Sequence, residues 1–228
     1  MKIYICHYTP LQERKLFFNE QIERLSLPVQ PVFIQEFDRE HLTDTHQQKF
    51  SKISSAEKSL FLKHMKCLEI IQASDVDFGI IMEDDCIFLD NFSTHLDNIL
   101  NNIPEEFDIL YTGVFPFYKQ KSNPVPPDRV SDKMFYDMKD VQIFPWTGNN
   151  KGTDFYIVSK KMCKQLIDVF NSTLQIPIPV DHWLGQVCYK MKCNVFWYRD
   201  EFTAHGSWGD GSGVNAVFGN SLSALRGH

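Results

Sequence analysis

The sequence lacks any apolar stretch that approaches the ~20 residues of a membrane-spanning helix, and it has no basic run of the kind that binds nucleic acid. Its formal net charge is -6, from 23 Lys and Arg against 29 Asp and Glu. The opening residues 1–7 are too few and too mixed in polarity for a signal peptide. These absences predict a cytoplasmic protein, of a bacterium or of a virus or its host cell, without a nucleic-acid partner or a transmembrane segment. They leave the oligomeric state open.

Cysteine pairs at zinc-ligand spacing are also missing. The six cysteines are scattered along the chain, without a CxxC pair, and most have apolar neighbours. This distribution predicts reduced, mostly buried thiols and argues against a structural zinc site. The phosphate-binding pattern GxxxxGK is absent as well, which places a nucleotidyl- or phosphotransferase last among the candidate functions.

What is present is the composition of a folded protein, 43% hydrophobic and 23% charged over 228 residues, which suits one large domain. Apolar periodicity and capping residues alternate strands with helices in the first half, and this predicts an α/β core with a largely parallel sheet. Strands are expected over 3–7, 29–37, 78–82, 107–112, 141–146, 153–158 and 193–198. Helices are expected after Thr9-Pro10 as far as Pro28, over 56–73, after Asn91 or Ser93, over 160–171 and over 181–191.

The most informative stretch is an apolar strand that leads directly into three carboxylates, Glu83, Asp84 and Asp85. The carboxyl ends of strands in open α/β sheets are where ligands tend to bind. Carboxylates so close together repel one another unless a positive group lies among them. A divalent cation, which prefers hard oxygen ligands, would supply that positive charge. The alternative interpretation is a solvated turn or a helix cap.

A second segment, 205–213, begins with His205 and is rich in glycine. Glycines bring backbone N–H groups close to a phosphate. A carboxylate pair plus one neutral imidazole, with open positions, suits Mn²⁺ or Mg²⁺ held partly by substrate phosphates. No local spacing joins His205 to Asp85, and a lone His is more often an ordinary surface or core residue.

Asp181 stands in a third segment, Pro179-Val180-Asp181-His182-Trp183. An Asp at a helix start is most often an N-cap, and spacing alone favours that role. As a general base, its carboxylate would need to face an acceptor hydroxyl.

Several motifs in order resemble glycosyltransferase family 25, which includes bacterial lipooligosaccharide galactosyltransferases and collagen hydroxylysine galactosyltransferases. They are an opening strand and helix with Arg14, a helix with Ser55-Ala56-Glu57 and Lys63-His64, the Glu-Asp-Asp strand, a segment from Gly152 to Ser159, and Pro179 to Trp183. The resemblance covers residues 1–205, and the family's Ser-His is Lys63-His64 here.

The resemblance implies a GT-A type fold, a Rossmann-like three-layer α/β core with a mixed central sheet, that binds a UDP-sugar through Mn²⁺ or Mg²⁺. The Glu-Asp-Asp segment would act as the metal-binding DxD motif, with Asp85 as direct ligand, Glu83 or Asp84 in support and His205 as a further ligand. The expected donor contacts are His7, Tyr8, Thr9, Arg14, Glu57, His64, Glu83 and Asp84. We expect a single domain over 1–228, with a nucleotide-sugar-binding half (1–112) and an acceptor-binding half (113–228) that includes the Gly-rich C-terminal segment.

Family 25 is inverting, which implies in-line attack by an acceptor hydroxyl and a carboxylate base on the face opposite UDP. Asp181 is the first candidate for this base and Asp154 the second, with hydrogen bonding to sugar hydroxyls as the alternative for either. Three tryptophans are candidates to stack on sugar faces, with core positions as their alternative: Trp146, Trp183 and Trp208. The segments 115–140 and 206–213 are expected to close over the donor, or else to be ordinary surface.

The sequence therefore predicts an inverting, metal-dependent transferase. It would move a hexose, galactose or glucose, from a UDP-sugar to a hydroxyl of a glycan, glycolipid or glycosylated protein. The alternative is a non-catalytic homologue that binds glycans or nucleotide without turnover. Four metal-compatible groups argue against that alternative: Glu83, Asp84, Asp85 and His205.

Overall fold

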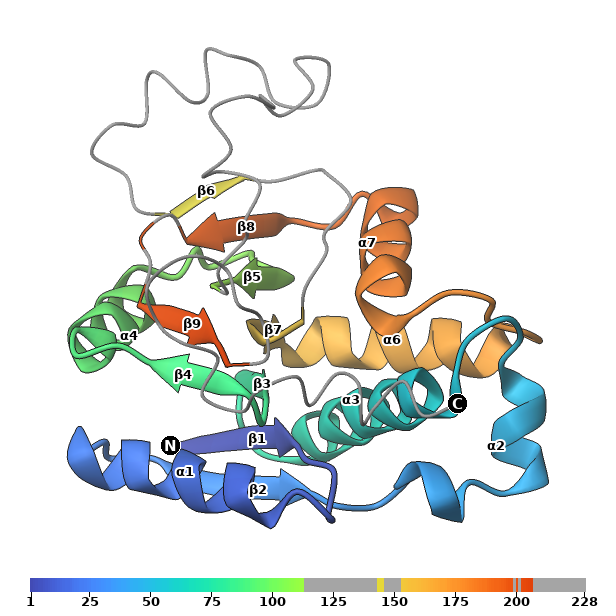
Figure 1. The fold of residues 1–228 in the computed structure, drawn as a ribbon. Coiled ribbons are helices and arrows are strands. Elements are labelled where there is room, and N and C mark those ends of the chain that lie inside the picture. The colour runs from blue at the N-terminus through green and yellow to red at the C-terminus, as the bar shows by residue number, and fades with distance from the viewer. Residues whose placement is uncertain (113–142, 146–152, 199, 201, 207–228) are drawn as a thin grey trace, which may run out of the picture.

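The computed structural model describes residues 1–112, 143–145, 153–198, 200 and 202–206 (Figure 1). In chain order these residues form β1 (Lys2–Cys6), α1 (Gln12–Arg24), β2 (Gln30–Ile34), η1 (Arg39–His41), α2 (Asp44–Lys49), α3 (Ser55–Ala73), β3 (Phe78–Glu83), β4 (Cys86–Phe88), α4 (Phe92–Asn102), β5 (Ile109–Tyr111), β6 (Ile143–Pro145), β7 (Phe155–Ser159), α6 (Lys160–Ser172), α7 (Val180–Met191), β8 (Val195–Tyr198) and β9 (Thr203–His205). The expectations placed on 115–140, Trp146, Trp208 and most of 206–213 lie outside the described residues. None of the described helices is both long and apolar enough to span a bilayer.

Within the described residues, seven strands form one mixed sheet in the order β2-β1-β3-β7-β5-β8-β6. β1 is parallel to β2 and β3, and β5 is parallel to β8. β7 lies antiparallel between β3 and β5, and β6 is antiparallel to β8. The α/β class with a mixed central sheet is confirmed. The narrower expectation of a largely parallel sheet is wrong, because the later strands enter the sheet in both directions.

Helices and a small second sheet cover the two faces of this sheet, which gives three layers (Figure 1). Successive side chains of a strand point to opposite faces of the sheet, so one strand contributes to both cores. In β1, Tyr4 and Cys6 belong to one core and Ile3 and Ile5 to the other. The first core includes buried apolar side chains of α3, α6 and α7. The second includes buried apolar side chains of α1, β4 and α4.

Two helix starts follow the capping signals in the sequence. Ser54 accepts a hydrogen bond from the Glu57 N–H, and the Glu57 side chain accepts one from the Ser54 N–H, so α3 begins with a capping box. Ser159 caps α6 by accepting from the Met162 N–H. Both helices therefore begin within one residue of their expected positions.

A two-stranded sheet of β4 and β9 is the element that the sequence did not predict. Each strand has only three residues, and the pairing joins Cys86 to His205 and Phe88 to Thr203. Strands this short carry little periodic signal of their own. The pairing still matters for the site, because it returns the chain to the acidic cluster.

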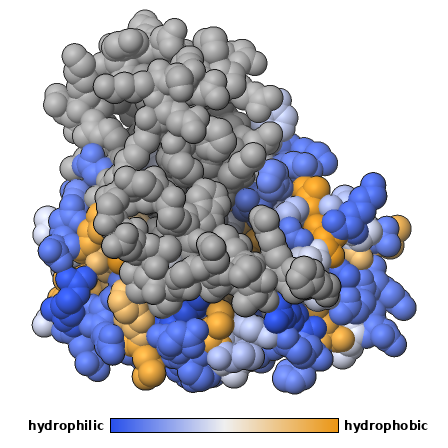
Figure 2. Space-filling model, viewed as in Figure 1, coloured by the Kyte–Doolittle hydropathy of each residue, from blue (hydrophilic) through white to orange (hydrophobic). Residues whose placement is uncertain are grey.

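On the face that Figure 2 presents, the visible side chains of the described residues are mostly hydrophilic. Figure 2 shows separate apolar areas on the face that it presents, set among hydrophilic side chains. The most exposed large apolar side chains of the described residues include Leu16, Leu174 and Tyr189. Exposed apolar residues that stand singly are normal for a soluble surface.

Close packing of β3 on α3 depends on Gly79. A Cβ atom built at Gly79 would lie 2.4 Å from both Cδ1 and Cγ1 of Ile71, a side chain that is fully buried. We expect Gly79→Ala to lower the free energy of unfolding by about 1–3 kcal/mol, because overpacking forces side chains and backbone to shift. Urea unfolding of this variant measures the effect.

A double-mutant cycle is the control for the Gly79 prediction. Ile71→Val removes one methyl group at the contact, so Gly79→Ala should cost less in that background than in the native one. Equal costs in the two backgrounds would contradict the proposed contact.

Candidate active site

The acidic cluster forms where two parallel strands end side by side. β1 and β3 pair with Cys6 opposite Glu83, so the residues that follow, His7 and Asp84, emerge next to each other. His7 Nδ1 lies 2.8 Å from Asp84 Oδ2, and the Tyr8 N–H donates to the same oxygen at 3.3 Å. The turn after β1 and the turn after β3 are therefore tied together by the Asp84 carboxylate.

Arg14, from the first turns of α1, supplies positive charge inside the cluster. Its Nη1 lies 2.8 Å from Asp84 Oδ1 and 3.6 Å from Asp85 Oδ2. All three side chains are more than nine-tenths buried. Burial alone would lower the pKa of Arg14, but Asp84 and Asp85 outweigh it and raise that pKa. The chain itself thus provides part of the positive charge that three adjacent carboxylates require.

Glu83 points to the other side of β3, where α3 and the start of β7 hold it. Thr153 Oγ1 donates to Glu83 Oε1 at 2.6 Å, and His64 Nε2 lies 3.6 Å from the same oxygen. His64 Nδ1 lies 3.0 Å from the Tyr156 hydroxyl oxygen. Burial would lower the pKa of His64, but Cys6 and Glu83 raise it to about 10. The His64 imidazole therefore lies against the Glu83 carboxylate.

The backbone of His205 reaches the acidic cluster through the small sheet. His205 pairs with Cys86, the residue after Asp85, and the Gly206 N–H donates to the Asp85 carbonyl oxygen at 2.7 Å. Two segments that are 120 residues apart in sequence therefore meet at this point. The His205 side chain lies outside the described residues.

The types of residue at this position suit a hard divalent cation. Asp85 and Glu83 offer carboxylate oxygens, which Mn²⁺ and Mg²⁺ prefer. Asp84 is less suited to direct ligation, because its two oxygens already contact Arg14 and His7. Among the described side chains, no group of three His, Cys, Asp or Glu residues could hold a metal ion. The fit therefore rests on Asp85 and Glu83 together with the backbone position of His205.

A second set of contacts fixes the turn that follows β1. The Thr9 N–H donates to Asp38 Oδ1 at 3.3 Å, and Lys63 Nζ donates to the same oxygen at 2.8 Å. Lys63 and Asp38 are both buried, and Lys63 also donates to the Glu36 carbonyl oxygen. Lys63 therefore holds the loop after β2, and Asp38 of that loop holds Thr9 of the loop after β1.

The Tyr8 side chain lies on the outer part of the same turn. Its hydroxyl donates to Glu40, and the Arg39 guanidinium lies 5.0 Å from the centre of its ring. Sequence analysis gave no role to Asp38, Arg39 or Glu40, because these residues fall in a polar segment without a motif. Their contacts with a turn that already carried site candidates are visible only in the structure.

Three candidate site residues remain, in different segments of the chain: Glu57, Asp154 and Asp181. Glu57 belongs to the capping box of α3, as described above. Asp154 lies beside Glu83, whose N–H donates to the Asp154 carbonyl oxygen at 3.0 Å. The Asp154 carboxylate also helps to raise the pKa of Cys86, after the larger effect of burial. Thr153, its neighbour, was not predicted as a site residue, although it stands in one of the motifs.

Asp181 lies in the first turn of α7, and the N-cap of that helix is Pro179. The N-cap interpretation of Asp181 is therefore wrong. Asp181 Oδ1 accepts from the His182 N–H at 2.8 Å, and its side chain is 23% exposed. Trp183, two residues further along the helix, is buried against Phe61 and Phe170. That packing corrects the sugar-stacking interpretation of Trp183 in favour of a core position.

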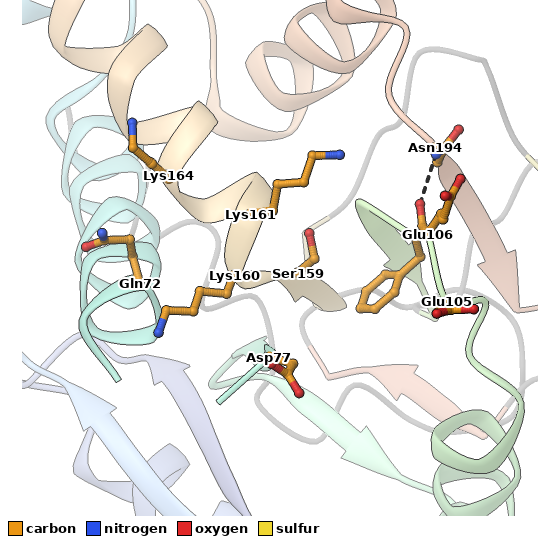
Figure 3. A pocket seen from close by; sticks show the side chains of 10 residues that line it. Gln72, Asp77, Glu105, Glu106, Ser159, Lys160, Lys161, Lys164 and Asn194 are labelled. Carbon is orange, nitrogen blue, oxygen red and sulfur yellow. Dashed lines mark hydrogen bonds between the residues drawn. The ribbon is translucent and has the colours of Figure 1, made fainter. Parts of the chain in front are cut away.

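A cavity of about 730 Å³ lies at the opposite end of the sheet. Its lining includes Asp77, just before β3, and Ser159, at the end of the antiparallel strand β7 (Figure 3). Figure 3 shows Lys160, Lys161 and Lys164 of α6 around it, with acidic Glu105 and Glu106 across from them. The acidic cluster lies after the other end of β3, about 20 Å away at the usual rise per residue. This cavity is therefore separate from the candidate active site.

Comparisons with known proteins give one family match. Residues 1–184 match the model of glycosyltransferase family 25, described as LPS biosynthesis protein. Among solved structures, the galactosyltransferase LgtC in complex with donor and acceptor sugar analogues is 8% identical, with a TM-score of 0.46, over 99% of this chain and 95% of that chain. Mouse xyloside xylosyltransferase 1 in its apo form is 13% identical, with a TM-score of 0.42, over 88% and 71% of the two chains. No curated protein matches the chain.

Proposed function

Because the chain belongs to glycosyltransferase family 25, we propose that it is an inverting, metal-dependent enzyme of the GT-A type. It transfers a hexose, galactose or glucose, from a UDP-sugar to a hydroxyl of a glycan, a glycolipid or a glycosylated protein. The observation that carries this proposal is the buried carboxylate cluster at the carboxyl ends of β1 and β3, beside the backbone of His205. Its position is the one where open α/β sheets bind ligands.

Asp85 is the proposed direct ligand of Mn²⁺ or Mg²⁺, with Glu83 and His205 as further ligands. A divalent cation held there would act as a Lewis acid and offset the negative charge that develops on UDP as it leaves. Arg14 and His7 hold Asp84, and through it they fix the backbone turn that presents Asp85. His64 and Thr153 hold Glu83 in the same way from the other side.

The turn after β1 is the proposed uridine contact. Tyr8 and Thr9 are anchored by their backbone N–H groups to Asp84 and Asp38. Anchoring leaves the exposed parts of this turn in a fixed position, which lowers the conformational entropy lost when the donor binds. His7 and Arg14 are buried, so their proposed role is to position the turn and the carboxylates.

Asp181 is the proposed general base, and Asp154 is the proposed partner of the donor sugar hydroxyls. The partial exposure of Asp181 in the first turn of α7 suits a residue that meets an acceptor from solution. Asp154 is buried beside Glu83, which suits a residue that holds the donor.

Asp181→Asn is expected to reduce turnover by about 10²- to 10⁴-fold, because an amide cannot take the proton of the acceptor hydroxyl. UDP binding in the presence of Mn²⁺ should stay at the native value. Steady-state kinetics with a saturating donor, together with calorimetric titration of UDP, separates the two effects. Asp168→Asn is the matched control, because Asp168 is an exposed carboxylate on α6 that pairs with Lys164.

Two outcomes would change the assignment of the base. Full activity of Asp181→Asn would remove Asp181 from the chemistry. A turnover loss confined to Asp154→Asn, with UDP affinity preserved, would transfer the role of base to Asp154.

A further inference from the structure

The end of α7 brings two cysteines, Cys188 and Cys193, against each other. Lys192 adopts the left-handed conformation there, with φ 55° and ψ 45°. The Cys193 N–H donates to the Cys188 carbonyl oxygen at 3.0 Å, and the Lys192 N–H donates to that of Tyr189 at 3.3 Å. These are the two hydrogen bonds of a Schellman motif, which is frequently accompanied by a contact between the side chains of its first and sixth residues. The backbone at the end of α7 therefore brings the two cysteines together.

The two thiols differ in exposure and in acidity. Cys188 is buried, whereas Cys193 is only half-buried. A hydrogen bond from Cys188 lowers the pKa of the Cys193 thiol, and the nearby Lys161 acts in the same direction. That same contact raises the pKa of Cys188, and burial adds to the effect. Cys193 is thus the more accessible thiol and the one that more readily becomes a thiolate.

A small molecule has a route to the neighbourhood of Cys193. The next residue, Asn194, lines the cavity of about 730 Å³ shown in Figure 3, and so does Lys161. Met162, which follows Lys161, places its Sδ 3.8 Å from Cys193 Sγ. This cavity plays no part in the proposed transfer reaction.

A second cysteine pair in the same chain provides a contrast. Cys6 Sγ and Cys67 Sγ lie 3.9 Å apart, but both residues are buried. Burial, followed by the contact with Cys67, raises the pKa of Cys6. Partial exposure and a lowered thiol pKa at Cys193 therefore distinguish Cys188 and Cys193 from this buried pair.

We propose that Cys188 and Cys193 form a redox site that a hydroperoxide converts into a reversible intramolecular disulfide. The Cys193 thiolate attacks the terminal peroxide oxygen, the O–O bond breaks, and the protonated leaving oxygen departs as water or an alcohol, so Cys193 becomes a sulfenic acid. Cys188 sulfur then attacks Cys193 sulfur, the S–O bond breaks, and the Cys188 proton leaves with that oxygen as a second water. Two thiols lose two electrons, and one peroxide gains them. An external dithiol restores the reduced pair.

Mass spectrometry of the native, reduced protein treated with hydrogen peroxide tests this proposal. The intact mass should fall by about 2 Da, the mass of the two hydrogen atoms lost. Alkylation after denaturation should label two fewer cysteines than the six that are free in the reduced protein, and a subsequent dithiothreitol step should restore six. Proteolysis without reduction should yield a linked peptide that contains Cys188 and Cys193.

Two variants make the assignment specific. Cys193→Ser should lose the mass change, whereas Cys67→Ser should keep it. In Cys188→Ser the sulfenic acid on Cys193 has no resolving thiol, so a sulfenic-acid probe such as dimedone should label Cys193. Peptide mapping of the native sequence needs no variant to fold.

Three outcomes would overturn the proposal. They are six alkylated cysteines after peroxide treatment, a linked peptide that joins Cys6 to Cys67, and a disulfide between two copies of the chain. None of these readouts depends on transferase activity.

Discussion

Replacing Asp85 with asparagine is expected to weaken Mn²⁺-dependent UDP binding by about 100-fold or more, since even the outer residues of metal sites contribute 10- to 100-fold to metal affinity. The change keeps the shape of the side chain and removes one carboxylate from a buried cluster that already holds Glu83 and Asp84. Folding should therefore be preserved. Calorimetric titration of UDP, with Mn²⁺ and with a chelator, measures the loss.

Asp90→Asn is the matched control for the Asp85 variant. Asp90 is the next acidic residue along the chain, its side chain is 95% exposed, and it pairs with Arg24. This control should bind UDP like the native protein. Native UDP affinity in Asp85→Asn would remove Asp85 from the metal site.

Arg14→Met is expected to reduce the free energy of unfolding by about 3–5 kcal/mol, because it leaves buried carboxylates without their positive partner. Arg14 and Asp84 have side chains only 4% and 6% exposed, with Nη1 and Oδ1 2.8 Å apart. Urea unfolding monitored by fluorescence and by circular dichroism gives the difference. The double variant Arg14→Met/Asp84→Asn should recover part of the lost stability, because it also removes the negative charge of Asp84, which Arg14→Met alone leaves buried without this partner.

Arg24→Met provides the comparison on the surface. Arg24 also pairs with an aspartate, but the two side chains are 49% and 95% exposed, and such pairs contribute at most about 1 kcal/mol. A similar loss of stability in the two arginine variants would contradict the account of Arg14 as the charge partner of the cluster.

Much of the first half of the fold could be predicted from the sequence, because its signals are local. Ser54 and Glu57 mark the start of α3, and the apolar run before Glu83 marks β3. Parallel strands bring their carboxyl ends to one edge. That rule is enough to expect that residues after β1, such as His7, meet residues after β3, such as Asp84, as the structure shows.

The rest of the site depends on contacts between distant segments that no local sequence pattern predicts. The antiparallel strand β7 lies between β3 and β5, and this order brings Thr153 to Glu83. The three-residue strands β4 and β9 bring the backbone of His205 to Cys86. Lys63 pairs with Asp38, which lies in a polar segment that carries no sequence pattern of its own.

The measurement that tests the central claim most directly is UDP release from a panel of UDP-sugars, with and without Mn²⁺, by the native protein and by Asp85→Asn. No acceptor is needed, because slow hydrolysis of the donor is enough. The account predicts release from one UDP-hexose, lost with a chelator and lost in Asp85→Asn. Absence of release from every sugar, together with absence of Mn²⁺-dependent UDP binding, would contradict it and favour a non-catalytic glycan-binding homologue.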